Sequence, residues 1–590
     1  MNFDKKTLFA FILIGFVLLL INTPIYKRVF FPELYKAQQQ RKIQQMAEAV
    51  EQKRDSLISN KEQASGVLPV DLLPPKTDKR EQIGPAETEN LSEKLYEVDS
   101  DFYKAVLSSK GANLVGWSLK NYKGPDDNAV QMLPENASST LSISFISTQG
   151  DTINTSEWSF TTYSPSSIRL PANNSSTIEF VCDLGDERRL IKKFTFFPGL
   201  YHIEMEVSLV KMGDLIAEKV YFLNAEDGLA STEKRLNDDM YYAKAAIAAG
   251  GEVNKKFKTN GQLYKETGDI DWVAARTKYF VLAIVPQGKK GLSGQIVGEE
   301  IQINETTKTK WKRYAISITM PFLNSDFVKD NYLVYLGPLD QDIIKSYKIG
   351  IEDIMDFGFV VIQPFSQAIL WSLKKMHGFI PNYGIVLILF SIIIKIIVYP
   401  LTRKSNESMK KMQALQPKLS EIKEKYGKDP QRLNKETMKL YKSEGVNPAG
   451  GCLPMLLQMP LLWGLFIVFR STIELRGQGF IWWIKDLSMP DAVVTLPFSI
   501  PMYGDSVCIL PLFMGATMLI QQKMTVTDPK QKMMVYFMPL FLTLLFNQFP
   551  SGLNLYYALF NLLSIIQQKG LPGAKKQSTV ETAGKGKRIK

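Results

Sequence analysis

The 590-residue chain has few of the side chains that build enzymatic and metal sites. Its three cysteines are Cys182, Cys452 and Cys508, and its two histidines, His202 and His377, lie far apart. An odd number of scattered cysteines provides neither a disulfide framework nor a thiolate metal site. The sequence also lacks a Walker-type phosphate loop and a nucleophile motif. We therefore predict no catalytic residues, no metal, no cofactor and no enzymatic activity.

Acidic residues are absent from five long apolar stretches in the C-terminal half of the chain. A bilayer core about 30 Å thick is crossed by roughly 20 helical residues, so each stretch is predicted to be a transmembrane helix. The N-terminal segment 1–24 is also apolar but has no cleavage site, and it is predicted to be an uncleaved signal anchor. The absence of Asp and Glu argues against a carboxylate proton relay. The five other predicted spans are 382–402, 450–471, 506–522, 533–549 and 552–568, which gives six in total.

One lysine, Lys395, lies inside the first of the five stretches. A cation at the centre of a membrane helix costs roughly 2.5 to 3.5 kcal/mol on the most lenient insertion scale. The long stem of Lys395 could lift the ammonium toward the headgroups near Arg403. Alternatively, Lys395 lines a water-filled cavity within the protein, with Ser391 one turn before it on the same helical face. The residues leave both alternatives open.

A polar stripe follows one face of the last predicted helix. Its members are spaced three and four positions apart, so they lie above one another on the helix. Within lipid, such a stripe either holds helices together or faces water, and an intramembrane lysine favours the second alternative. The stripe consists of Asn554, Tyr557, Asn561, Ser564 and Gln568, and Gln458, Thr517 and Asn547 add polar groups on other predicted helices.

The segment 98–350 has the composition of a water-soluble β domain. Short strand-like runs recur between Gly, Asn, Asp and Pro, and residues 192–209 are predicted to form a hairpin. Alternation of apolar and polar residues predicts an antiparallel β-sandwich with a wet exterior. The preceding segment, 25–97, is predicted to contain a polar helix and a flexible linker. With no catalytic constellation, the domain is predicted to be a scaffold or binding module.

The distribution of charge predicts which segments lie on the inner side of the membrane. The loop 403–447 contains twelve basic and six acidic residues, so the positive-inside rule places it in the cytoplasm. Heptad-like spacing and a break at Gly427 predict a helical hairpin there. Its charges form either a solvated face or a docking surface for an anionic partner or anionic lipid. The other predicted segments are an interfacial amphipathic helix at 357–380, a periplasmic loop at 472–505, a cytoplasmic loop at 523–532 and a basic cytoplasmic tail at 569–590.

Several motifs resemble the YidC/Oxa/Alb3 family of membrane protein insertases. They run in unbroken order over about 357–568, and the β domain adds the fragments WVAARTKYF and YLVYLGP. The large outer domain behind an uncleaved anchor is similar to the Gram-negative form with a large periplasmic domain. The C-terminal motifs are VYPLTRKS (398–405), LQPKLSEIKEKYG (415–427), YKSEGVNPAGGCLPMLLQMP (441–460), WWIKDLSMPD (482–491) and the run QQKMMVYFMPLFLTLLFNQFPSGLNLYY.

The resemblance implies a five-helix core around a hydrophilic groove that opens to the cytoplasm and sideways to lipid. Lys395 stands where the family usually has an arginine, so a compact ammonium group replaces a planar guanidinium group. Tyr557 matches a family tyrosine beside the groove, and Ser391 and Gln458 match lining positions. The predicted groove residues are Lys395, Ser391, Gln458, Tyr557, Asn554, Asn561, Thr517 and Asn547.

The resemblance further implies that the chain inserts and helps to fold integral membrane proteins in the inner membrane of a Gram-negative bacterium. Implied partners are nascent membrane proteins, the ribosome, the Sec translocon and signal-recognition machinery, with both termini of the chain in the cytoplasm. The alternative function is a secondary transporter that uses Lys395 as its coupling charge. Such a transporter would show internal repeats with paired broken helices, and the sequence shows none.

Overall fold

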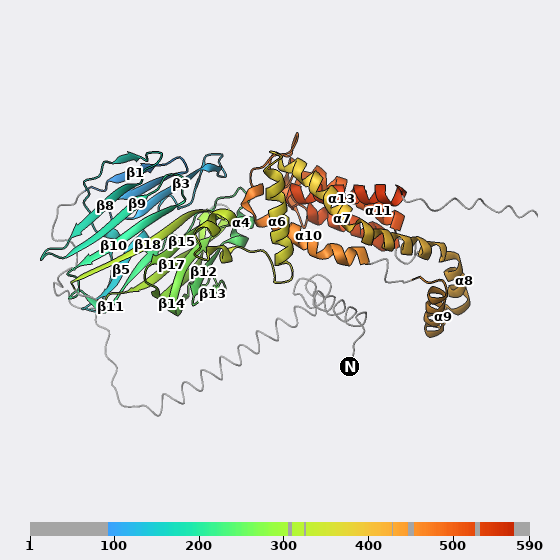
Figure 1. Cartoon of the computed structure of the whole chain (residues 1–590), viewed down its shortest axis with the longest axis horizontal. Helices are drawn as coiled ribbons and strands as arrows, with labels where there is room; N and C mark the ends of the chain where they lie inside the picture. The colour runs from blue at the N-terminus through green and yellow to red at the C-terminus, as the bar shows by residue number, and fades with distance from the viewer. Residues whose placement is uncertain are drawn as a thin grey trace, which may run out of the picture. The chain divides into compact units, whose positions relative to one another are not determined.

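The N-terminal part of the structure is a β domain made of two sheets (Figure 1). The computed structural model describes residues 92–304, 309–323, 326–427, 429–446, 453–525 and 532–570. The signal anchor at 1–24, nearly all of 25–97 and the tail beyond residue 570 therefore lie outside the described residues. The smaller sheet has the spatial order β4 (Ala129–Gln131), β3 (Leu114–Lys123), β2 (Tyr103–Ser108), β1 (Leu95–Asp99) and β7 (Ser167–Arg169).

The larger sheet is antiparallel throughout and contains the predicted hairpin, formed by β9 and β10. Its spatial order is β6 (Thr152–Asn154), β5 (Thr140–Ser147), β11 (Ile216–Ala225), β17 (Thr309–Pro321), β16 (Gly291–Asn304), β14 (Leu263–Arg276), β15 (Phe280–Gln287), β18 (Phe327–Pro338), β10 (His202–Val210), β9 (Arg189–Phe196) and β8 (Ser176–Asp183). In addition, β12 (Lys244–Ala249) pairs with β14, and β13 (Glu252–Asn254) pairs with β12.

Aromatic side chains join the two sheets into a sandwich. Tyr96 of β1 meets Phe180 of β8 edge to face, with ring centroids 5.3 Å apart, and Tyr122 of β3 meets Phe280 of β15 at 5.4 Å. Strand β9 alternates between buried and half-buried or exposed residues, as the sequence predicts. Strands β5 and β15 are buried along almost their whole length. The predicted wet exterior is wrong for these two strands, because other parts of the domain cover both of their faces.

A buried lysine ties the sheets together from the inner face of β9. The Lys192 ammonium is fully buried and donates to the Gly111 carbonyl (2.7 Å), the Leu141 carbonyl (2.9 Å) and Asn113 Oδ1 (3.0 Å). Two of these acceptors belong to the turn between β2 and β3, and the third belongs to β5. Three acceptors match the three donors of an ammonium group. Burial nevertheless lowers the pKa of Lys192 to about 7, because the charged form loses its hydration.

We expect Lys192→Met to destabilise the β domain and to change how its stability depends on pH. Each buried acceptor left unpaired costs roughly 1–3 kcal/mol. Since the folded pKa is about 7 and the unfolded pKa is near 10.5, the unfolded wild-type chain binds more protons between these values. The free energy of unfolding of the wild type therefore rises from pH 7 to pH 9, whereas the free energy of unfolding of Lys192→Met does not show this rise.

Urea unfolding of the full chain at pH 7 and at pH 9 measures the free energy of unfolding of both proteins. The half-buried neighbour, Lys193→Met, is the control; equal pH dependence in Lys192→Met and wild type would contradict the account.

The C-terminal part consists mainly of helices. An amphipathic helix, α6, runs crosswise to α7 and α10 (Figure 1). Its position corresponds to the interfacial helix predicted at 357–380, and His377 at its end stacks on Tyr383 with ring centroids 3.8 Å apart. The helices are α4 (Leu236–Tyr242), α5 (Gln341–Ser346), α6 (Gln363–His377), α7 (Tyr383–Ala414), α8 (Gln416–Tyr426), α9 (Pro430–Ser443), α10 (Leu453–Ser471), α11 (Ile509–Thr525), α12 (Lys532–Phe546) and α13 (Ser551–Gly570).

Helices α7, α10, α11, α12 and α13 correspond to the five predicted C-terminal spans. Among the described residues, α7 alone is long and apolar enough, over Tyr383–Pro400, to cross a membrane by length and composition. Helix α12 adds a shorter apolar stretch, Val535–Phe546. The count of six spanning helices stays a prediction. Helix α7 also extends well beyond residue 402, where the sequence analysis ends it, because Pro400 does not break the helix.

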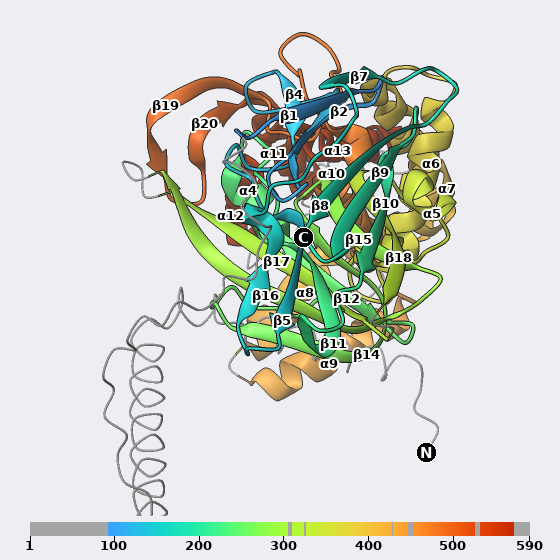
Figure 2. The ribbon, with the colours of Figure 1, turned by 90° about the vertical axis from the view of Figure 1, so that its left-hand side faces the viewer.

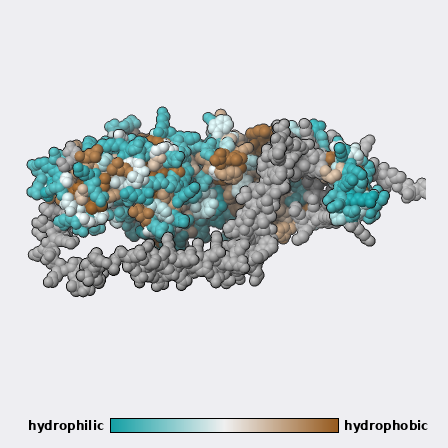
Figure 3. All heavy atoms as spheres, turned by 90° about the horizontal axis from the view of Figure 1, so that it is seen from below, coloured by the Kyte–Doolittle hydropathy of each residue, from teal (hydrophilic) through white to brown (hydrophobic). Residues whose placement is uncertain are grey.

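Two further elements flank the helices. Helices α8 and α9 pack against each other within the segment predicted as a hairpin, and their surface is hydrophilic (Figure 3). Between α10 and α11, where the sequence analysis expects a loop, the chain forms a two-stranded hairpin of β19 (Ala492–Ile500) and β20 (Gly504–Cys508). Figure 2 shows this hairpin projecting to one side of the body. Because β20 ends only at Cys508, α11 begins three residues later than predicted.

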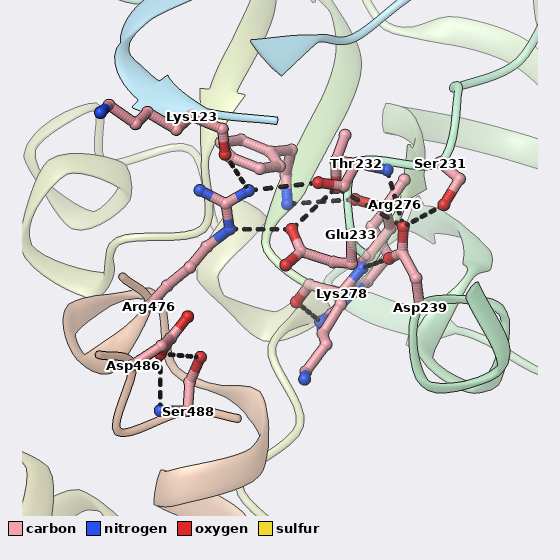
Figure 4. A network of polar contacts seen from close by, with 12 residues as sticks. Lys123, Ser231, Thr232, Glu233, Asp239, Arg276, Lys278, Arg476, Asp486 and Ser488 are labelled. Atoms are coloured by element: carbon pink, nitrogen blue, oxygen red, sulfur yellow. Dashed lines mark hydrogen bonds and ion pairs between the residues drawn. The ribbon is translucent and has the colours of Figure 1, made fainter. Parts of the chain in front are cut away.

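The β domain is joined to the helices through a buried ionic contact (Figure 4). Arg476, which follows α10, pairs with Glu233 at 2.8 Å, and each side chain is 9% exposed. The Arg476 guanidinium also donates to the carbonyls of Lys123 (2.7 Å) and Thr232 (3.1 Å). One planar group thus satisfies a carboxylate and two backbone acceptors, which fixes the position of the chain after α10 against the β domain.

Candidate functional site

The side chain of Lys395 contacts α13 from about two-thirds of the way along the apolar part of α7, Tyr383–Pro400. Lys395 lies twelve residues after Tyr383, which is about 18 Å along the helix axis. Its ammonium donates to Ser564 Oγ at 2.6 Å and lies 4.3 Å from the centroid of the Phe560 ring. A hydroxyl and an aromatic face are both favourable partners for a cation. The structure therefore directs this ammonium toward α13 and not along its own helix to Arg403.

The partners of Lys395 belong to one face of α13. Phe560 and Ser564 are one turn apart, and the Ser564 hydroxyl also donates to the Phe560 carbonyl at 2.7 Å. The polar stripe predicted on the last helix includes Ser564 but not Phe560. Its spacing of four residues from Ser564 places it on the same face, so the cation–aromatic contact could have been found from sequence.

Other predicted groove residues are close to this pair. Ser391 is fully buried one turn before Lys395, and its hydroxyl donates to the Leu387 carbonyl at 2.7 Å. Asn561 is 8% exposed on α13. The hydroxyl of Tyr557 is buried without a hydrogen-bond partner among the described residues. Ser391, Tyr557 and Asn561 therefore add buried polar groups to α7 and α13 within two helical turns of the Lys395 contact.

The remaining predicted residues lie on other helices or nearer their ends. Gln458 is half-buried on α10, and Thr517 of α11 donates to its own helix at the Met514 carbonyl. Asn554 donates to the carbonyls of Phe546 (3.1 Å) and Phe549 (3.4 Å), at the α12–α13 turn. These three side chains are therefore distributed over α10, α11 and α13, and none of their hydrogen bonds described here is to Lys395.

Asn547, just after α12, holds the base of the hairpin. Its side chain accepts from the Cys508 amide (3.2 Å) and donates to the carbonyls of Ser506 (2.6 Å) and Tyr503 (2.9 Å). All its observed partners belong to β20 or the turn before it. The geometry gives Asn547 a structural role at the end of the bundle next to the β domain.

Burial changes sharply along the helix bundle. At the end near the β domain, the described helices are packed with fully buried apolar side chains. Toward the other end buried side chains are fewer: no residue of α11 from 518 to 524 is buried and residues 458–462 of α10 are half-buried, although Thr402 and Ser405 of α7, Val535 of α12 and Ile565 of α13 are still buried. Buried apolar residues at the packed end are Val386, Leu387 and Phe390 of α7, Leu465, Val468 and Phe469 of α10, and Leu553 and Tyr556 of α13.

Small residues allow the close packing at that end. A Cβ added to Gly552 of α13 would overlap the Phe469 ring of α10. A Cβ at Gly464 of α10 would lie 3.0 Å from Ile369 of α6. Close approach through small residues is the usual means of helix association in membranes. The bundle is therefore closed on the side of the β domain and open in packing on the other side.

These features define a class of protein. A helical membrane core carries a polar, cationic site in its looser half, and a large β domain is fixed to its closed end. Among the described residues, no group of three His, Cys, Asp or Glu side chains is placed to hold a metal ion.

Comparisons with known proteins agree with this class. Residues 95–372 match the model of the YidC periplasmic domain, and residues 375–576 match that of the 60 kDa inner membrane protein family. A membrane protein insertase YidC from Chlorobium phaeovibrioides is 38% identical over 80% of this chain and 82% of its own length. The YidC of Chloroherpeton thalassium is 34% identical over 96% of this chain and 95% of its own length. A crystal structure of an active YidC insertase covers 83% of this chain and 94% of that chain, at 18% identity and a TM-score of 0.35.

The chain belongs to the YidC family of membrane protein insertases. It is an inner-membrane protein with a periplasmic β domain, and its substrates are nascent membrane proteins. It acts as an insertase and not as an enzyme. Nothing in the comparisons supports the transporter alternative.

Proposed function

We propose that the loosely packed half of the bundle forms a hydrophilic groove, open to the cytoplasm, that receives the hydrophilic segments of incoming membrane proteins. The observation that carries this proposal is the Lys395 ammonium, which contacts Ser564 and Phe560 between the closely packed and the more loosely packed parts of the bundle. A cation at this depth is costly in hydrocarbon, so its position favours a wet surrounding. Gln458 lines the groove with it, and Ser391, Thr517, Tyr557 and Asn561 lie toward its closed end.

Asn554 and Asn547 take a different part in this proposal. Their bonds to backbone carbonyls at the α12–α13 turn and at the hairpin hold the closed end of the groove. These two side chains position the closed end of the groove and do not contact substrate. In this arrangement the groove ends below the β domain, and a hydrophilic segment has to cross only the remaining part of the bilayer.

The proposed mechanism depends on desolvation. A hydrophilic segment that crosses hydrocarbon must give up water, at several kcal/mol for each unsatisfied polar group. A wet half-channel shortens the dry distance and supplies polar partners along its length. Transfer of the adjoining apolar segment into lipid then supplies a favourable free energy of about 25 cal/mol for each Å² of apolar surface removed from water. No nucleotide hydrolysis is needed for this cycle.

The proposed topology puts both termini and the α8–α9 hairpin in the cytoplasm of a Gram-negative cell. The excess of basic residues over 403–447 supports this orientation. The same basic, hydrophilic surface suits anionic partners (Figure 3). We therefore include the ribosome, signal-recognition machinery and anionic lipids among the partners of this surface. The Sec translocon is a further proposed partner.

We expect Lys395→Leu to slow insertion and Lys395→Arg to preserve it. Loss of a charge-assisted contact worth roughly 1.5 kcal/mol corresponds to about a tenfold loss in rate. Insertion of a single-span substrate with a short hydrophilic tail into proteoliposomes measures the effect. Lys375→Leu, which removes an exposed lysine from α6, is the matched control. Wild-type insertion by Lys395→Leu would contradict the role of the charge.

Photo-crosslinking residues at Ser391, Gln458 and Tyr557 are expected to form adducts with the hydrophilic segment of a stalled nascent chain. The groove places these three positions on α7, α10 and α13 around one path. A probe at Leu540, which is exposed on α12 outside this path, serves as the control and is expected to react with lipid. If none of the three positions forms a nascent-chain adduct, substrates do not enter the groove as proposed.

A further inference from the structure

The β19–β20 hairpin exposes an uncharged, largely apolar surface. Residues 492–504 contain no charged side chain. Every residue of β19 is exposed except Leu496, which is half-buried. Val494, Phe498 and Met502 are 56%, 60% and 51% exposed. An isolated two-stranded hairpin is marginally stable in water, and exposed apolar side chains on it call for a covering partner.

The base of the hairpin is fixed to the periplasmic end of the bundle. The Asp491 carboxylate accepts from the backbone amides of Ile509 (3.0 Å) and Leu510 (2.8 Å), which open α11. The side chain of Gln548 donates to the Met502 carbonyl (3.2 Å), and the backbone carbonyl of Gln548 accepts from Arg235 of the β domain at 2.7 Å. The hairpin therefore starts beside the periplasmic domain, at the N-terminal end of α11.

The apolar surface of the hairpin continues onto α11. Directly after β20, the side chains of Ile509, Leu512 and Phe513 are 37%, 51% and 47% exposed. On a spanning helix, exposed apolar side chains face lipid. The hairpin is joined to this lipid-facing surface without an intervening charged residue from Ser506 onward. Figure 2 shows β19 and β20 extending to one side of the helices.

The backbone of β19 is poorly suited to pairing with a strand of another protein. Pro497 and Pro501 have no amide hydrogen, and the register of the hairpin shifts between Thr495 and Ile500. Prolines and bulges at a sheet edge prevent the addition of a further strand. They also leave fewer unpaired amides to be satisfied near hydrocarbon.

We propose that the β19–β20 hairpin lies in the interfacial layer of the periplasmic leaflet, with Phe498 and its apolar neighbours inserted among lipids. The open edges of the hairpin stay at headgroup depth, where water and headgroups satisfy their backbone groups. Trp482, 84% exposed in the preceding loop, suits the same layer. In this arrangement the hairpin contacts the periplasmic leaflet beside the helices, as a second interfacial element in addition to the amphipathic helix α6.

A fluorescent amino acid encoded at position 498 tests this assignment in the full-length protein in proteoliposomes. The matched control is the same residue at Phe327, an exposed aromatic position at the start of β18. Strand β18 is about 36 Å long and leads at its other end, Pro338, toward α5 and α6, so Phe327 lies at the end of the strand remote from the helices. Lipids with a shallow spin label are expected to quench position 498 roughly threefold or more strongly than position 327, with aqueous iodide giving the reverse order.

Two other outcomes would overturn the proposal. If iodide quenches both positions equally and spin-labelled lipid quenches neither, the hairpin stands in water. If position 498 is protected from both quenchers, and the protection disappears when the protein is diluted into excess lipid, a second copy of the chain covers the hairpin. Quenching does not depend on insertion activity, so these experiments test the position of the hairpin whether or not the proposed groove exists.

Discussion

A cation within a membrane helix must find polar partners, and this constraint organises the helical part of the molecule. Lys395 meets it through Ser564 and Phe560 on a helix that follows it by about 170 residues in sequence. The contact fixes which faces of α7 and α13 oppose each other. It also places the polar stripe of α13 in the interior, where Tyr557 and Asn561 extend it. One costly charge thereby specifies how two helices are oriented and where the site lies.

The two ends of the bundle are built differently, and the difference suits a one-sided groove. Toward the periplasm, glycines permit close contact, and aromatic residues such as Phe390 and Tyr556 fill the space. Asp491 and Asn547 satisfy the backbone at this end, and Arg476 fixes it to the β domain. Toward the opposite end the described helices carry mostly half-buried and exposed side chains. A rigid closed end and a loosely packed open end are what an insertase needs if substrates enter from one side only.

The sequence predicted the parts that depend on local pattern. Hydropathy located the five C-terminal helices to within a few residues at most ends, and helical spacing identified the stripe on α13. Local sequence patterns failed where contacts between residues far apart in the chain determine the structure. The β19–β20 hairpin was missed because Pro497 and Pro501 are typical of loops. Lys192 and Arg476 carry no local signal, since their acceptors are brought together only by the packing of sheets and domains. For the site, the pattern found Lys395 and Ser564 separately, and the structure supplied their contact.

The most direct test asks whether water reaches the inner half of the bundle and stops at Lys395. Single cysteines at Asn561 and at Leu553, both buried on α13, compare the two halves on one helix. The full-length protein, with its native cysteines replaced, is treated from the cytoplasmic side with a membrane-impermeant thiol reagent. The account predicts labelling at position 561 and none at position 553. Labelling at neither position would mean that the inner half is dry, which would contradict the groove.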